Sequence, residues 1–189
     1  MAKQLLCIGS RQILTVHLRT CLPTVAWPLP SKFSTHHSVT MSTLQYYAYP
    51  DQGVRLREKS SYSQAVRVGD RIECAGQGGW DSTSGEMKKE LYDEVDQAFE
   101  NVDRNLKDAG GKGWSQVFRV NSYHTDMSDE ALHYTVKNLK KWMPDHQPLF
   151  TCVGVTKLGI EGMRIEIEVS AYDEEGAEVS RKARAEKKQ

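Results

Sequence analysis

Apolar residues recur at helical spacing in two segments of the chain. The clearer stripe runs through Leu91, Val95, Ala98, Phe99, Val102, Leu106 and Ala109, at steps of three and four residues. This spacing predicts an amphipathic helix that ends at Gly110-Gly111, with its acidic residues in solvent and not around a metal. A second helix is predicted between an N-cap at Ser128 and a stop at Pro144.

Strand-like alternation of apolar and polar positions fills most of the remaining core. The predicted strands are 62–68, 71–76, 116–125, 150–155 and 163–171, the last giving the strongest signal. Gly69-Asp70 joins the first two as a hairpin. The order is therefore β-β-α-β-α-β-β. We predict an α+β domain in which two helices pack on one face of a mixed sheet.

A glycine-rich stretch, Gly76-Gln77-Gly78-Gly79-Trp80, ends the second predicted strand. No Lys-Ser/Thr pair follows it and no helix opens directly from it, so a phosphate-binding loop is a weak interpretation. A tight turn in which another part of the chain approaches the backbone closely is the favoured one.

Length and charge narrow the class of protein. A chain of 189 residues suits one domain, and its 25 basic and 25 acidic residues balance. Residues 51–172 hold 16 basic and 20 acidic residues, which argues against a nucleic-acid partner. The four cysteines have no paired spacing, so neither a metal site nor a disulfide framework is predicted. No apolar run is long enough for a membrane span, and no membrane partner is expected.

The two ends of the chain differ from the core. Residues 1–40 contain no acid and have the basic and apolar composition of a mitochondrial transit peptide. Met41 begins a second plausible start, so an alternative start stays open, and the expected location is mitochondrial or cytoplasmic. Residues 174–189 are highly charged and nearly free of large apolar residues, which predicts a disordered tail.

Five short segments, taken in order and spacing, resemble the reactive intermediate deaminase (Rid, or YjgF) family. They are Tyr62-Ser63-Gln64-Ala65, Ala75-Gly76-Gln77, Asp126-Met127-Ser128-Asp129, Thr151-Cys152-Val153 and Ile165-Glu166-Ile167-Glu168. The resemblance covers residues 47–173. It implies a chorismate-mutase-like fold, a homotrimer with small-molecule clefts between subunits, and, in the best-known branch, hydrolysis of enamines and imines without a cofactor.

The resemblance also implies a set of site residues. Tyr62 matches a tyrosine that lines the cleft, Glu166 a catalytic glutamate that helps place water, and Cys152 a cysteine beside the substrate. Gly76 lies at the matching strand end and is predicted to contact the ligand. Phe150 stands where the family has an arginine that grips the substrate carboxylate. A phenyl ring offers no hydrogen-bond fork and repels an anion, so we predict a neutral, apolar or aromatic ligand.

Three functions remain open on the sequence. The first is a cofactor-free deaminase or hydrolase, which includes a specialised metabolic tailoring enzyme; the second is a non-catalytic trimer that binds a small molecule or acts as a chaperone. An endoribonuclease is disfavoured by the acidic core. Arg119, Lys157 and Arg164 are alternative sources of positive charge, although the sequence does not place them in the cleft. His124 and His133 are predicted at a surface or interface.

Overall fold

The computed structural model describes residues 42–186, so the predicted leader lies outside the described residues. Its elements are β1 (Gln45–Tyr47), α1 (Gln52–Ser60), β2 (Ala65–Val68), β3 (Arg71–Gly78), α2 (Leu91–Asp108), a 3-10 turn (Trp114–Gln116), β4 (Val117–His124), α3 (Asp129–Trp142), β5 (Leu149–Gly154), β6 (Ile165–Tyr172) and α4 (Glu174–Glu186). All seven predicted elements are present, each within about three residues of its predicted bounds.

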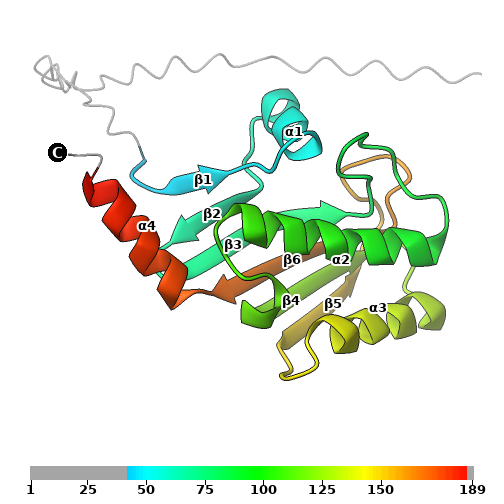
Figure 1. The fold of residues 1–189 in the computed structure, drawn as a ribbon. Helices are drawn as coiled ribbons and strands as arrows, with labels where there is room; N and C mark the ends of the chain where they lie inside the picture. Colours follow the sequence, from blue (N-terminus) through cyan, green and yellow to red (C-terminus); the bar gives the residue numbers. More distant parts are fainter. Residues whose placement is uncertain (1–41, 187–189) are drawn as a thin grey trace, which may run out of the picture. The chain divides into compact units, whose positions relative to one another are not determined.

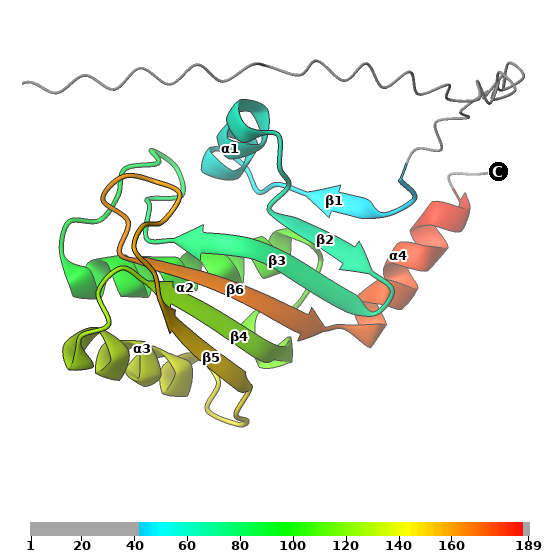
Figure 2. The same cartoon turned by 180° about the vertical axis from the view of Figure 1, so that it is seen from behind.

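The six strands form one sheet in the order β1-β2-β3-β6-β4-β5. The β4–β5 pair is parallel and the other pairs are antiparallel, so the sheet is mixed. Helices α2 and α3 lie along one face (Figure 1). From behind, the strands stand in front of both helices (Figure 2). The α+β prediction with two helices on one face is confirmed, and we call the opposite side of the sheet the uncovered face.

The core lies between this sheet and α2. Val95, Ala98, Phe99, Val102 and Leu106 of the predicted stripe are all fully buried. Strand β6 alternates as its sequence predicts: its isoleucines, valine and alanine are buried, and the polar residues between them are partly exposed. This alternation turns Glu166 and Glu168 toward the uncovered face.

Three elements were not predicted. Strand β1 has only three residues, and α1 buries only Gly53 and Leu56, so neither gives a periodic apolar signal. The prediction of a disordered C-terminal tail was wrong over Glu174–Glu186, which form α4. Asp173 Oδ1 accepts a hydrogen bond from the Gly176 amide (3.2 Å) at the start of this helix. An aspartate before two glutamates is an N-terminal helix signal that the composition of the tail masked.

Two predictions of exposure were also wrong. Glu94 of α2 is fully buried, and its carboxylate accepts hydrogen bonds from the Arg164 amide (2.6 Å) and from Arg164 Nε (2.5 Å). His124 is 2% exposed, and its Nε2 lies 3.0 Å from Ser122 Oγ. In both cases the partner comes from the fold and not from the local pattern. No helix within residues 42–186 is long and apolar enough to cross a membrane.

Candidate functional site

Gly76 and Glu166 meet on the uncovered face. The register between β3 and β6 shifts between Cys74 and Gln77, which marks a bulge in β3. At this bulge the Glu166 carboxylate lies directly over Gly76, and a Cβ on Gly76 would overlap Glu166 Oε1. Glycine is therefore required here so that the carboxylate can approach the backbone, as the sequence suggested for this stretch.

The surroundings of Glu166 favour its neutral form more than water would. Burial raises the pKa of the Glu166 carboxyl, and the nearby negative charge of Glu168 raises it further. Glu168 Oε2 in turn accepts a hydrogen bond from the Tyr123 hydroxyl (3.1 Å). A partly buried carboxyl with a raised pKa holds its proton more readily than an ordinary one, which suits a general acid–base group.

Tyr62 is the second predicted residue on this side of the molecule. It is half-buried and packs beside the small apolar cluster of Leu56, Trp80 and Met163. Burial raises the pKa of the Tyr62 hydroxyl, and the charge of Glu166 contributes in the same direction. Glu166 therefore lies against Gly76 and near enough to Tyr62 for its charge to act on the hydroxyl.

A buried chain of hydrogen bonds supports the strand end that carries Gly76. Trp80 Nε1 donates to the Tyr49 hydroxyl (3.0 Å), which donates to Gln77 Oε1 (3.0 Å). Gln77 Nε2 then donates to Gln64 Oε1 (3.0 Å). Gln64 and Gln77 are fully buried, so these amides tie the segment after Tyr62 to the segment after Gly76 and hold the bulge in place.

Phe150 and Cys152 lie on the other face of the sheet. Their partners on β4 are Val120 and Ser122, both buried against the helices, and paired residues share a face. Cys152 Sγ lies 3.6 Å from the sulfur of Met127, just before α3. Within one chain, these two residues cannot share a pocket with Glu166.

Phe150 forms part of a cavity of about 330 Å³ between α3 and the start of β5. Most of the lining is apolar and includes Val136, Leu139, Met143 and Pro148. The cavity has no carboxylate and would accept an apolar or aromatic group.

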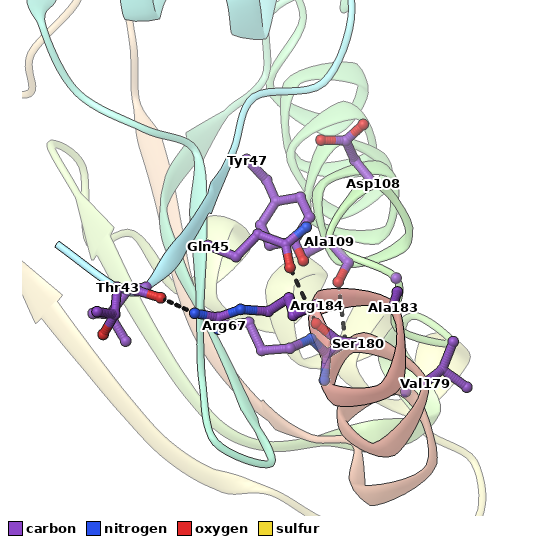
Figure 3. A pocket seen from close by; sticks show the side chains of 13 residues that line it. Thr43, Gln45, Tyr47, Arg67, Asp108, Ala109, Val179, Ser180, Ala183 and Arg184 are labelled. Carbon is purple, nitrogen blue, oxygen red and sulfur yellow. Dashed lines mark hydrogen bonds between the residues drawn. The ribbon is translucent and has the colours of Figure 1, made fainter. Parts of the chain in front are cut away.

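A larger cavity, of about 580 Å³, lies between β1, α4 and the end of α2 (Figure 3). Its polar side chains serve to hold α4: Arg67 donates to Asp173 Oδ2 (2.7 Å) just before the helix, and Ser180 Oγ donates to Gln45 Oε1 (3.1 Å). None of the five predicted site residues lines this cavity. Asp108, whose carboxyl pKa is raised by burial, also lines this cavity, so the preference for the Glu166 site rests on the predicted residues and not on size.

Arg164 was one of the residues that could supply the positive charge missing at Phe150. Arg164 is held by the buried Glu94 carboxylate, so it is not available to a ligand. Sequence reasoning did not single out Tyr123, whose contact with Glu168 depends on the β4–β6 register. Within residues 42–186, no three His, Cys, Asp or Glu side chains are grouped so as to hold a metal ion.

Residues 53–173 match the model of the family described as Endoribonuclease L-PSP. The chain belongs to this family. The family also includes the YjgF-type proteins, so the resemblance seen in the sequence is confirmed.

Two related proteins and one solved structure of the same family are also similar to this chain. A 2-iminobutanoate/2-iminopropanoate deaminase of Dermatophagoides farinae is 33% identical over 108 residues, covering 57% of this chain and 81% of that protein. The mitochondrial protein mmf1 of Schizosaccharomyces pombe is 28% identical over 127 residues, covering 66% and 75%. The crystal structure of RidA from the Antarctic bacterium Psychrobacter aligns with a TM-score of 0.57 at 28% identity, covering 70% and 99%.

Proposed function

We propose that this protein hydrolyses small reactive enamines or imines without a cofactor, at a site built around Glu166. The observation that carries the proposal is the Glu166 carboxyl itself: it lies over Gly76, near Tyr62, and burial raises its pKa. The similarity to a protein named as an imine deaminase supports the reaction class.

The reaction needs water and a group that moves protons. An enamine first becomes its imine tautomer; water then adds to the imine carbon, the C–N bond breaks, ammonia leaves and a carbonyl product remains. The Glu166 carboxylate accepts a proton from the attacking water and gives it to the nitrogen, and it then moves the hydroxyl proton of the resulting carbinolamine to the same nitrogen as ammonia leaves. A carboxyl whose pKa lies above its usual range performs both transfers more readily than an ordinary one.

The proposed active unit is a homotrimer with the site between subunits. Phe150 and Cys152 lie on the helix-covered face of β5, whereas Tyr62 and Glu166 are on the uncovered side. A cleft that contains all four must therefore take its two walls from two copies of the chain. In such a cleft the Phe150 wall receives the neutral, apolar or aromatic part of the ligand.

A direct test is to generate 2-aminoacrylate in vitro and to follow the release of pyruvate with and without the protein. We expect acceleration by the wild type and its loss in Glu166→Gln, which keeps the shape of the side chain but cannot accept the proton. A Phe150→Arg variant is expected to bind this carboxylate-bearing substrate more tightly, because a guanidinium forms charge-assisted hydrogen bonds. If neither the wild type nor Phe150→Arg accelerates pyruvate release, the hydrolase function is wrong.

A non-catalytic small-molecule carrier or chaperone is the second candidate, and the apolar cavity beside Phe150 favours it. Binding there needs the cavity but not Glu166, so cellular activity that survives Glu166→Ala would favour the carrier.

An endoribonuclease is disfavoured because Glu73, Glu166 and Glu168 share the uncovered face and would repel phosphates. For location, we propose the mitochondrion, as for the similar mmf1. Failure of residues 1–40 to direct a fluorescent protein there would contradict this.

A further inference from the structure

A cavity of about 470 Å³ extends from Tyr62 along the uncovered side of β2 and β3. Its polar lining consists of Tyr46, Arg57, Ser61, Tyr62, Ser63 and Glu73. Tyr62 lines the cavity and its hydroxyl also feels the charge of Glu166, so the cavity and the proposed site share Tyr62, although Glu166 and Gly76 do not line the cavity. Its volume exceeds that of a small amino or imino acid, so it leaves room for a larger side chain on the ligand.

The end of helix α1 sets Arg57 beside this cavity. Arg57 lies in the last turn, where its carbonyl accepts the Ser61 amide (2.9 Å). Ser61 adopts a left-handed conformation (φ 54°), which ends the helix and turns the chain directly into Tyr62. The backbone therefore fixes the spacing of the Arg57 and Tyr62 backbone positions, and the Arg57 side chain itself is exposed.

The guanidinium of Arg57 is free to bind a ligand. Across residues 42–186 it has no salt bridge or side-chain hydrogen bond, whereas Arg67 is paired with Asp173 and Arg164 with Glu94. Burial raises the pKa of Asp108 and the charge of Arg57 opposes this rise, but the two groups form no salt bridge. An unpaired guanidinium beside a cavity is the group that best recognises a carboxylate.

The cavity also has one negative group. Glu73 faces it from β3 and accepts a hydrogen bond from the Ser170 hydroxyl. A ligand that carries a carboxylate at one end and a protonated nitrogen at the other matches this pair of charges. A simple anion or a simple cation satisfies only one of them.

We propose that Arg57 is a substrate-binding residue that holds the carboxylate of an α-imino acid beside Tyr62 and takes over the role that Phe150 cannot perform. The inference rests on the proposed function and names its substrate class. The substrate then carries a carboxylate for Arg57, an imine carbon for water placed by Glu166, and a side chain of its own.

The role of Arg57 can be tested by measuring kcat and KM of the full chain for the hydrolysis of two substrates. One is 2-iminopropanoate, formed from 2-aminoacrylate, and the other is benzaldimine, an imine without a carboxylate. We expect Arg57→Met to raise KM for 2-iminopropanoate by about 10- to 100-fold, as loss of a charged hydrogen bond does, with little change in kcat. Benzaldimine kinetics should not change. Arg57→Lys should recover part of the loss because it keeps the charge without the fork.

Lys59→Met is the matched control, because Lys59 lies in the same turn of α1, is exposed and does not line the cavity. Equal kinetics for Arg57→Met and the wild type would overturn the assignment and leave the hydrolase function standing. If the wild type accelerates the hydrolysis of neither imine, the hydrolase function is wrong. Titration calorimetry of ligand binding then tests the Arg57 site by itself. Binding of 2-oxobutanoate, but not of 2-butanone, that depends on Arg57 would support the carboxylate site; binding that does not depend on Arg57, or no binding, would overturn it.

Discussion

At the scale of single residues, the site depends on what lies next to Glu166. In an alternating strand this carboxylate would ordinarily face solvent with an ordinary pKa. The bulge in β3 instead places the Gly76 backbone beneath it, and Glu168 adds a like charge on the same face. Both the burial and the like charge favour the protonated acid. A carboxylate that would be unremarkable in the sequence thereby becomes a candidate acid–base group.

The like charge can be tested through pH dependence. If the Glu166 carboxylate accepts the proton, activity falls as the pH drops through its raised pKa. Glu168→Gln removes one cause of the increase and keeps an acceptor for Tyr123, so the acidic limb of kcat/KM should move to lower pH. Glu161→Gln removes an exposed carboxylate that does not contribute to the Glu166 shift and lines neither proposed cavity, and it serves as the control. An acidic limb that stays in place in Glu168→Gln would contradict this account.

At the scale of elements, α4 shows how a charged segment becomes ordered. It buries only Ala177, so apolar burial contributes little to its stability. Its first turn is instead anchored by the Arg67–Asp173 pair, with side chains 5% and 1% exposed and 2.7 Å apart. Gln116 Nε2 also donates to Asp173 Oδ1 (2.8 Å). The pair joins β2, the turn before β4 and the start of α4.

Arg67→Met should therefore be strongly destabilising, because it leaves the buried Asp173 carboxylate without its partner. We expect the free energy of unfolding in urea to fall by about 3–5 kcal/mol. Arg181→Met breaks the exposed pair with Asp70 and should cost less than about 1 kcal/mol. Similar losses in the two variants would show that the buried pair does not anchor the helix.

At the scale of the whole molecule, the edge strand β5 carries apolar side chains that a single copy leaves in water. Leu149 is 60% exposed and Val153 is 40% exposed, on a strand that pairs with β4 in parallel. An exposed apolar edge is a surface that proteins normally cover. This is the element that the proposed trimer would bring against a neighbouring copy.

Light scattering at several protein concentrations can test the assembly. The wild type should have the mass of three chains, and Leu149→Glu with Val153→Glu should have the mass of one, because burying two new carboxylates opposes association. Val179→Glu on α4, where the side chain is 68% exposed, should leave the mass unchanged. A monomeric wild type would contradict the trimer and with it the shared cleft.

The local sequence was sufficient for most of the fold. Period-three-and-four and period-two patterns predicted α2, α3 and five strands, because burying one side of each element imposes that spacing on the chain. The family resemblance rested on the order and spacing of five short segments, and both can be seen in the sequence without a structure. Helix α1 and strand β1 escaped prediction because each buries too little to leave a periodic signal.

What the sequence by itself determined is the α+β class and the family, and Phe150 in place of the arginine stays a prediction from the resemblance. The tertiary structure decided which side chains share a face: Tyr62, Gly76 and Glu166 on one side, Phe150 and Cys152 on the other. It also decided that Arg164 is occupied and that Arg57 is free. These outcomes depend on strand register and on partners distant in the chain, which no local pattern encodes.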